Sequence, residues 1–598
     1  MIVYRISDEL PLRRIHSRTH VCAAVQRSAL LLVIFIVAAG TVVLGQVSEQ
    51  NPQSNEQQRR VRGTVVNSVT HAPVGRALVS TSDSRLATLT DSEGHFEFVL
   101  PTPSAESTTF FMQGQQTLPS SYAFEFSGLS ARKPGFLKDP NDSPRDGEFP
   151  VGDMTITLMP EALIKGRVAL SEADAAVGID VQVFMMQVQE GLPRWMPGAS
   201  VRTNSAGEFR FAELAPGAYR LVTHELMDND PVAVVPGGQL YGYAPVYYPG
   251  VSDFGSAATI QLMAGQIFQA DLSVTRQPYY SVKMAVASGE AINGMNINVS
   301  VQGRRGPGYS LGYNNETKQI EGMLPNGNYL VEAATDGPTL ARGAAGLAVS
   351  GAPSEGSSLT LHRSGSIPLD VKEEFSNDAA RNDRISYSDG HRTFNVHGPQ
   401  QYLQARVEAA DDFEQQVNGQ IRPPTGPNDD SMILENLPPG RYWLRLNSSR
   451  GYVASATLGG VDLLHEPLVV GAGSGLPIEV KLRDDFAEME GSVAEMSTGS
   501  TTNGTVASRP YSSGVWAYCF PLPDSGGQFQ QLEVSTDGKF SLKMVPGSYR
   551  ILAFNARQLN LPYRDATAMR PYETKGEVVH LIAGQKATLQ VHLTSSSE

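Results

Sequence analysis

One serine in the chain stands in a sequence that resembles a catalytic motif. Gly308 to Gly312 reads Gly-Tyr-Ser-Leu-Gly, the pattern in which serine hydrolases place their nucleophile. That pattern indicates a nucleophile only where a strand runs directly into a helix, because the sharp turn between them exposes the hydroxyl. Here a Gly-Pro pair precedes the motif and two asparagines follow it closely. The sequence therefore favours a glycine-rich loop around Ser310 and no catalytic residue.

The histidines and carboxylates lack the spacing of a metal site. Catalytic zinc needs paired histidine and glutamate ligands, and none of the 11 histidines begins a His-x-x-Glu or His-Glu-x-x-His motif. The adjacent His224 and Glu225 would diverge on a strand. Asp91, Asn204 and Asp537 have too few carboxylate neighbours for calcium, so we expect them to cap the backbone of their own turns. The sequence predicts no metal, no cofactor and no enzymatic activity.

Aromatic side chains are the remaining candidates for a binding site, because the C–H faces of a sugar ring pack well on tryptophan or tyrosine. Trp443 follows Tyr442, so if Tyr442 faces a core, strand alternation turns Trp443 outward. Tyr247 and Tyr248 lie in a tyrosine-rich loop, and Trp195 is a weaker candidate. These four residues are the candidate carbohydrate-binding residues. The alternative is that Trp443 packs on a neighbouring unit and that the tyrosines pack on one another.

A recurrent turn shows which elements must position these residues. Pro-Gly-x-Tyr, or the variant Asn-Gly-x-Tyr, occurs four times, with tyrosines 110, 113 and 107 residues apart (Tyr219, Tyr329, Tyr442 and Tyr549). This period matches one small domain. Glycine supplies a positive φ, and the tyrosine starts the next strand with its ring inward and its hydroxyl near a corner. The chain is therefore predicted to be an array of similar modules.

Hairpins with alternating apolar residues precede several of these turns. Thr203 to Phe211 places Asn and Gly in a turn and then two phenylalanines on one face, and Thr90 to Phe98 and Ser535 to Leu542 repeat the pattern. The 57 glycines, 38 prolines and 41% hydrophobic residues indicate a folded chain with many turns. Period-2 alternation together with many turns predicts an all-β fold.

Together, these motifs resemble the carboxypeptidase regulatory-like domain. The matching features are a first strand of the form apolar-x-Gly-x-Val, a Pro-Val pair, the Thr-Asp-x-x-Gly-x-Phe turn and the Leu-x-Pro-Gly-x-Tyr turn. The resemblance implies a transthyretin-like sandwich of seven strands with a carbohydrate-binding-like topology and no catalytic apparatus. The predicted fold is a tandem array of five such β-sandwiches after a signal segment and a linker at 46–60: residues 61–160, 162–276, 279–363, 364–485 and 487–594.

The N-terminus is predicted to direct export. Residues 1–45 contain five arginines, an apolar run from Ala29 to Leu44 and small residues just before Gln46, which are typical of a signal peptide. An uncleaved membrane anchor is the alternative. The net charge of −14 disfavours nucleic acid as a partner. Cys519 is alone after the signal, so no intramolecular disulfide is expected.

These observations favour a non-catalytic exported protein that binds or acts as a scaffold. The expected location is the periplasm, the cell surface or the extracellular space, with membrane contact only through residues 1–45 if they remain. The expected partner is a polysaccharide or another component of the cell envelope. The alternative is a structural array that binds another envelope protein and no glycan.

Overall fold

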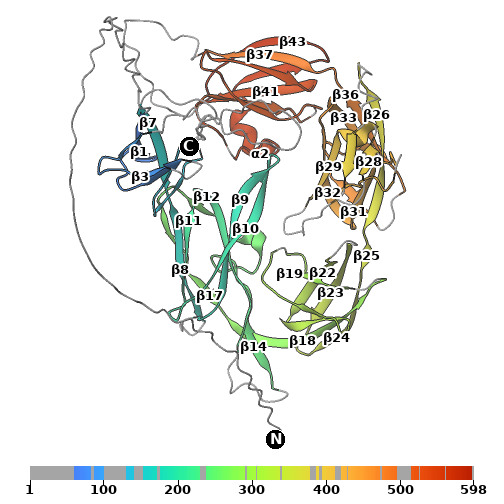
Figure 1. Ribbon diagram of the computed structural model, residues 1–598. Coiled ribbons are helices and arrows are strands. Elements are labelled where there is room, and N and C mark those ends of the chain that lie inside the picture. Colours follow the sequence, from blue (N-terminus) through green and yellow to red (C-terminus); the bar gives the residue numbers. More distant parts are fainter. Residues whose placement is uncertain are drawn as a thin grey trace, which may run out of the picture. The chain divides into compact units, whose positions relative to one another are not determined.

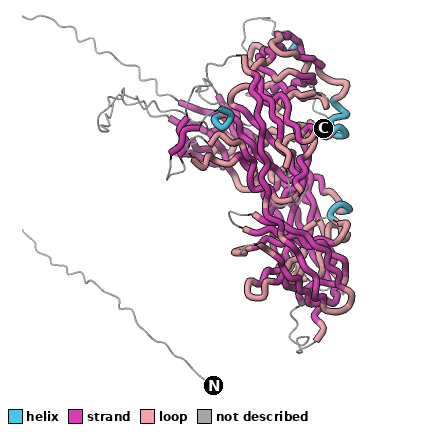
Figure 2. Tube along the Cα trace, turned by 90° about the vertical axis from the view of Figure 1, so that its right-hand side faces the viewer, coloured by secondary structure: helices cyan, strands magenta, loops and turns pink. Residues whose placement is uncertain are grey.

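The computed structural model describes residues 60–81, 86–99, 129–140, 153–170, 176–228, 238–289, 292–304, 306–336, 340–376, 385–388, 393–396, 398–410, 419–426, 429–471, 475–494, 514–523, 525–558 and 560–594. Regular structure within them is almost entirely β-strand, and the helices are short, such as α2 (Ala566–Met569) (Figures 1 and 2). The prediction of an all-β fold is confirmed.

The predicted signal peptide, residues 1–45, lies outside the described residues, as does the linker up to residue 59. Within the described part of the chain, no helix has the length and hydropathy needed to cross a bilayer.

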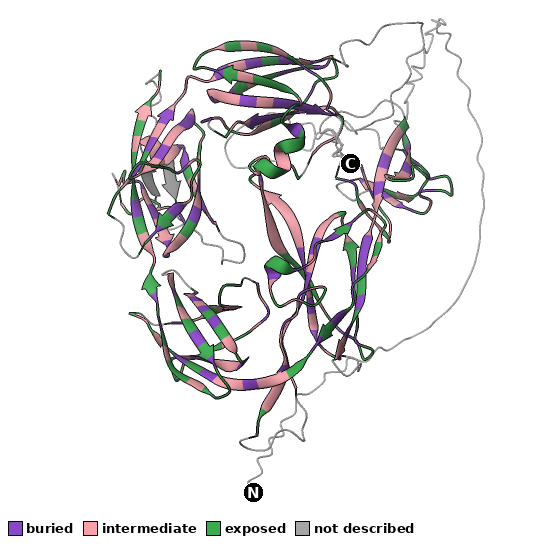
Figure 3. Ribbon diagram, turned by 180° about the vertical axis from the view of Figure 1, so that it is seen from behind, coloured by how far each residue is buried: buried purple, intermediate pink, exposed green. Residues whose placement is uncertain are grey.

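Alternation of apolar and polar side chains explains why these segments are strands. In β4 (His95–Val99), Phe96 and Phe98 are buried while the three residues beside them are exposed. Figure 3 shows the same alternation of buried and exposed residues along other strands. The buried faces build five main hydrophobic cores, each of which falls within one predicted unit. The unit boundaries themselves stay predictions.

The first and fifth sandwiches each show seven strands in two sheets. The first has the sheets β4-β1-β7-β6 and β3-β2-β5, and the fifth has β40-β37-β43 and β39-β38-β41-β42. Their further elements are β1 (Arg60–Asn67), β2 (Leu78–Thr81), β3 (Ala87–Leu89), β5 (Leu129–Arg132), β6 (Phe136–Lys138), β7 (Asp153–Pro160), β37 (Ala487–Val493), β38 (Trp516–Pro521), β39 (Gln530–Glu533), β40 (Lys539–Met544), β41 (Gly547–Phe554), η4 (Arg570–Tyr572), β42 (Glu577–Leu581) and β43 (Lys586–Val591).

The second sandwich is built from the sheets β10-β9-β12-β15 and β11-β8-β16, and β17 also pairs with β8. Its elements are β8 (Ala162–Leu170), β9 (Asp180–Gln189), β10 (Leu192–Arg202), β11 (Glu208–Leu214), β12 (Gly217–Thr223), β13 (Leu226–Met227), β14 (Leu240–Tyr243), η1 (Phe254–Ser256), β15 (Ile260–Leu262), β16 (Ile267–Gln269) and β17 (Leu272–Val274). The hairpin strands β13 and β14 leave these sheets and join the next sandwich.

The third sandwich combines the sheet β19-β22-β23-β25 with a sheet centred on β18. The fourth has one nine-stranded sheet, whose strands enclose a single core, and the separate hairpin β27-β28. Their elements are β18 (Arg276–Ala287), β19 (Met295–Val301), β20 (Gly312–Asn314), β21 (Gln319–Pro325), β22 (Gly327–Thr335), β23 (Ala341–Val349), β24 (Ser354–Thr360), β25 (His362–Arg363), β26 (Gly365–Glu374), β27 (Ile385–Ser388), β28 (Thr393–Val396), η3 (Gly398–Gln401), β29 (Leu403–Ala409), β30 (Gln420–Ile421), β31 (Ile433–Leu437), β32 (Gly440–Ser448), β33 (Tyr452–Leu458), β34 (Val461–Asp462), β35 (Leu468–Val470) and β36 (Ile478–Arg483).

Every sandwich closes its first strand against a late strand that runs in the same direction. β1 pairs in parallel with β7, β8 with β16 and β17, β18 with β24, β26 with β36, and β37 with β43. In the first, second and fifth sandwiches the first strand has a glycine at a position where its neighbours leave no room for a side chain, whereas β18 of the third sandwich contains no glycine. A Cβ at Gly166 would overlap the backbone of Ala270 and the ring of Phe209, and a Cβ at Gly491 would overlap the ring of Phe540.

The four recurrent tyrosines form the same corner in four cores. Each is almost fully buried, and each hydroxyl donates to the backbone carbonyl four residues upstream. The donor–acceptor distances are 2.6 Å for Tyr219 to Ala215, 2.9 Å for Tyr329 to Pro325, 2.8 Å for Tyr442 to Pro438 and 2.6 Å for Tyr549 to Val545. The predicted inward ring of Tyr442 is therefore observed, and its hydroxyl fixes the turn that precedes its own strand.

Cys519 lies in the fifth core, where its side chain is fully buried. Burial raises the pKa of its thiol to about 12. Because the thiolate is the reactive form, the thiol should react with an alkylating reagent only when the fifth sandwich opens. Cys519 is thus a built-in reporter of that opening.

We expect Tyr549→Phe to speed maleimide labelling of Cys519 about 5- to 30-fold, because the Val545 carbonyl loses its buried donor at a cost of about 1–2 kcal/mol. Mass spectrometry of the Cys519 peptide measures the labelling rate. Tyr442→Phe removes the same bond from the fourth sandwich and is the matched control, for which the rate should not change. Equal acceleration by both substitutions would contradict independent cores.

Candidate functional site

The second and third sandwiches share one hydrogen-bonded sheet. β14 pairs antiparallel with the start of β18, and the sheet runs in the order β13-β14-β18-β21-β20. Polar and aromatic side chains from both sandwiches meet beside this sheet. We call the following set the junction cluster: Glu225, Tyr247, Tyr279, Tyr309 and Ser310.

The glycine-rich loop of the third sandwich docks on the second. The Glu225 N–H donates to the Gly308 carbonyl at 3.1 Å, and the Tyr247 hydroxyl donates to the Pro307 carbonyl at 2.6 Å. Gly306 and Gly308 have positive φ angles of 134° and 137°, and a Cβ at either position would overlap Tyr247 or Pro245. The loop therefore needs its glycines for close approach, and no helix follows Ser310 as a nucleophile motif would require.

Ser310 is bound by a carboxylate and by no imidazole. Its N–H and its hydroxyl both donate to Glu225 Oε1, at 2.6 and 2.8 Å. The neighbouring His224 side chain points elsewhere and contacts Gln182 Oε1 at 3.0 Å. The expected divergence of His224 and Glu225 is observed, and within the described residues Ser310 has no histidine partner to act as its general base.

Two buried polar atoms in the junction cluster have no hydrogen-bond partner among the described residues: Glu225 Oε2 and the Tyr279 hydroxyl. Burial raises the pKa of Glu225, and its bonds from Ser310 lower it in part. Burial also raises the pKa of Tyr279, and the nearby Glu225 raises it further. A carboxyl group with a raised pKa keeps its proton to a higher pH. The arrangement therefore disfavours a negative charge on Glu225 and on Tyr279.

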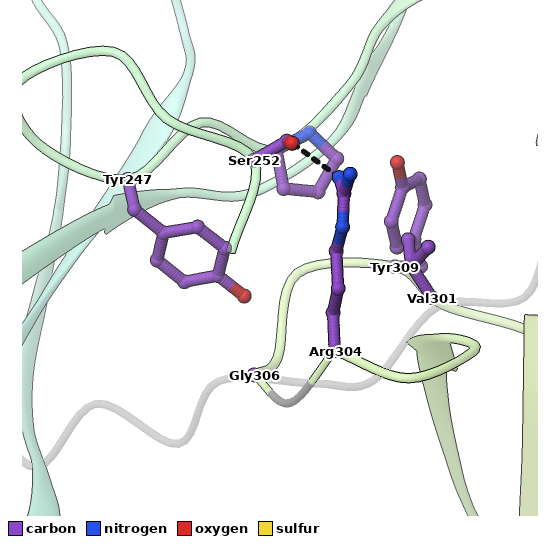
Figure 4. A pocket seen from close by; sticks show the side chains of 7 residues that line it. Tyr247, Ser252, Val301, Arg304, Gly306 and Tyr309 are labelled. Atoms are coloured by element: carbon purple, nitrogen blue, oxygen red, sulfur yellow. Dashed lines mark hydrogen bonds between the residues drawn. The ribbon is translucent and has the colours of Figure 1, made fainter. Parts of the chain in front are cut away.

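The cavity at the junction is too small for a sugar. Its volume is about 10 Å³, and it is lined by Pro245, Tyr247, Ser252, Val301, Arg304, Gly306 and Tyr309. Figure 4 shows Arg304 rising between the two tyrosine rings, with its guanidinium hydrogen-bonded to Ser252. Such a volume holds roughly one water molecule, whereas ligand pockets are typically about 300–1,000 Å³. The cavity therefore has room for a water molecule at the junction and no room for a sugar ring.

Three of the four predicted carbohydrate-binding residues pack within the second sandwich. Tyr247 is 4% exposed, with its ring edge-on to Phe254 at 5.7 Å. Trp195 packs on the same phenylalanine at 5.7 Å. Tyr248 contacts Phe268 at a centroid distance of 6.1 Å. All three rings thus pack on phenylalanines, whereas the alternative interpretation expected the tyrosines to pack on one another.

Trp443 lies on the outer face of its strand, opposite the buried Tyr442, and is half-buried. The guanidinium of Arg445 stands 5.5 Å from the centre of its ring. Glu408 lies opposite Trp443 on β29 and approaches Arg445 at 3.8 Å. Only 18% of each of the Arg445 and Glu408 side chains is exposed, so the ring of Trp443 lies beside an ion pair on a partly covered face.

The described residues contain no group of three or more His, Cys, Asp or Glu side chains that could hold a metal ion. The predicted turn caps are observed. Asp91 Oδ1 accepts from Glu93 N and His95 N at 2.9 and 2.8 Å, and Asn204 Oδ1 accepts in the same way from Ala206 N and Glu208 N, both at 2.9 Å. Asp537 Oδ1 accepts from Lys539 N at 3.2 Å.

A second recurrent turn was missed in the sequence analysis. Ala264 to Gln266 and Ala583 to Gln585 are both Ala-Gly-Gln, and each turn binds the linker that enters its own sandwich. Gly265 N donates to Pro160 O at 3.1 Å, and Gly584 N donates to Asp485 O at 3.3 Å. In return, Leu163 N donates to Gln266 O and Glu488 N to Gln585 O, each at 2.8 Å. The repeated tripeptide was the available signal for these linker clamps.

No protein-family model matches the chain, and no curated protein matches it. Solved structures match at low similarity. The Bacillus anthracis TIE protein is 10% identical with a TM-score of 0.14, and the match covers 72% of this chain and 73% of that chain. A streptococcal ancillary pilin is 11% identical with a TM-score of 0.19, covering 54% and 99%. GBS52, the minor pilin of Streptococcus agalactiae, is 14% identical with a TM-score of 0.17, covering 37% and 97%.

Values this low assign neither a family nor a function to the chain. The resemblance to the carboxypeptidase regulatory-like domain stays a prediction.

We expect the stability of the junction to depend on the charge of Glu225. The pKa of Glu225 is raised in the folded chain, so its folded state binds more protons, and the junction loses stability as pH rises from the unfolded pKa to the folded one. Glu225→Gln cannot ionise and keeps an acceptor for Ser310. The protection of the loop 306–312 in the Gln variant, relative to the original chain, should therefore increase with pH.

Hydrogen exchange followed by mass spectrometry measures this protection at each pH. Glu225→Ala is the control that removes the acceptor: it should speed exchange in the loop about fivefold at low pH, where Glu225 is protonated, and this excess should shrink as Glu225 ionises. A ratio between the Gln variant and the original chain that stays constant with pH would refute the assignment of this pH dependence to Glu225.

Proposed function

We propose that this chain is an exported, non-catalytic scaffold that holds a row of β-sandwiches in a defined arrangement and presents their surfaces to a partner in the cell envelope. The observation that carries the proposal is the junction cluster. Glu225 and Ser310 are the side chains best suited to acid–base and nucleophilic chemistry. Here they bond to each other and join two sandwiches beside a shared sheet.

The arrangement of the junction supports a structural role over turnover. A serine nucleophile needs a base that takes its proton and an open site for substrate. Ser310 instead donates to a carboxylate with a raised pKa, next to a cavity with room for about one water. Export is supported by the arginine-rich and apolar sequence of residues 1–45.

Two assays on the full chain test the scaffold role. Hydrolysis of a nitrophenyl ester should stay at the background rate and should not change in Ser310→Ala. Capture from an envelope extract should return a defined protein that soluble glycans do not compete away. Ester turnover that disappears in Ser310→Ala would overturn the non-catalytic assignment, and release of the partner by glycans would redirect the proposal to a sugar ligand.

Carbohydrate binding at Trp443 is the second candidate, favoured by the position of this ring on an outer face beside Arg445 and Glu408. If Trp443 stacks on a sugar, Trp443→Ala should weaken binding on a glycan array by about 5- to 30-fold, as expected for the loss of about 1–2 kcal/mol. Tyr248→Phe, which keeps its packing ring, is the control and should bind normally. Absence of binding to every arrayed glycan would remove this candidate.

A further inference from the structure

The parallel closure of each sandwich joins the points where the chain enters and leaves it. In the fifth sandwich the chain enters through β37 and leaves through β43, which pair in register from Glu488 with Lys586 to Val493 with Val591. The first and fourth sandwiches have the same arrangement, with six register pairs each. In the second sandwich the closure is divided between β16 and β17, and in the third it is made by the last long strand, β24.

Side chains tie the same strand pairs together. Ion pairs cross the closure in four sandwiches: Arg62 to Asp153 at 3.2 Å, Lys283 to Glu355 at 3.1 Å, Lys481 to Glu374 at 3.6 Å, and Lys586 to Glu488 at 2.6 Å. In the second sandwich Asp271 Oδ1 accepts from the backbone N–H of Arg167 at 2.9 Å. Ion pairs also cross other strand pairs, as between Arg60 and Glu97 and between Arg202 and Asp180, and an exposed pair contributes little to stability at equilibrium, so these contacts add to the closure without distinguishing it.

The direction of the strands is what distinguishes the closure mechanically. Because the two strands run the same way, the entry of the chain lies at one end of the ladder and the exit at the other. Tension between the chain ends pulls the strands past each other along their length, so all hydrogen bonds of the ladder are loaded together. Antiparallel terminal strands would place entry and exit at the same end, and the bonds would then break one at a time.

We propose that each sandwich is a tension-bearing unit, in which the parallel closure of the first strand against a late strand is a shear clamp that resists extension of the chain. This inference extends the proposed scaffold role from holding surfaces in place to carrying load. It depends only on strand order within each sandwich.

The fifth sandwich offers a matched pair of substitutions. Glu488 N donates to Gln585 O, and in a parallel ladder this places the N–H of Ala587 toward β37 and that of Thr588 away from it. β43 is the edge strand of its sheet, where proline is tolerated if its missing N–H faces solvent. Ala587→Pro thus removes a bond of the clamp, and Thr588→Pro removes none.

The full chain is held by its two ends and stretched in a single-molecule force experiment. We expect one unfolding event per sandwich, with about 350 Å of chain released by the fifth. Ala587→Pro should raise the unfolding rate of one event about fivefold at a given force. Thr588→Pro should leave that rate within about twofold. Equal effects of the two substitutions would overturn the proposal.

A change of pulling direction tests the clamp without altering its ladder. Thr536→Cys places a handle at an exposed position just before β40, which flanks β37 on the side opposite β43. Ser492 pairs with Lys539 and also with Gln590, so this handle and the C-terminal end of β43 lie at the same end of the sheet. Pulling between the handle and the C-terminus peels β43 away from that end, and the fifth sandwich should then unfold at a clearly lower force.

If Ala587→Pro does not fold, the comparison of the two pulling directions still tests the shear clamp. Equal resistance in the two directions would refute the shear clamp. The force experiment needs no ligand or partner, so its failure is separate from that of the scaffold proposal: a chain that captures no envelope partner but resists shear would disprove only the proposed function.

Discussion

The structure depends on one buried hydrogen bond that recurs in four cores. A tyrosine hydroxyl donates to a carbonyl four residues upstream, as in Tyr442 to Pro438. Since a buried carbonyl without a donor is costly, this bond holds the turn and the following strand in one geometry. That strand crosses the centre of a sheet, so the corner positions the rest of the sandwich. In the second to fifth sandwiches, the strand pairs, the closure by parallel strands and the junction rest on cores arranged in this way.

What the sequence predicted correctly is local. Alternation around Phe96 and Phe98, the cap at Asp91 and the inward ring of Tyr442 each follow from residues within a few positions of one another. The junction cluster could not be found in this way. The contact of Glu225 with Ser310 joins residues 85 positions apart, and it depends on how two sandwiches meet.

The positions of the predicted carbohydrate-binding residues also depend on contacts between distant parts of the sequence. Tyr247 and Trp195 belong to a loop and a hairpin that converge on Phe254, a residue whose position the strand pattern does not predict. Trp443 sits within a regular strand, so alternation alone placed it on the outer face. Alternation can assign a face to a side chain on a long strand, but it does not show what covers that face: Trp195 lies on the long strand β10 and still packs on Phe254.

The Ala-Gly-Gln turns also bear on how such a chain can change in evolution. Each turn lies inside a sandwich and binds the linker that enters it, through Pro160 in one case and Asp485 in the other. A duplicated segment that runs from a linker to the end of its sandwich would carry both halves of this attachment with it. Recombination at these two linkers can thus move a unit together with the contacts that attach it to its linker.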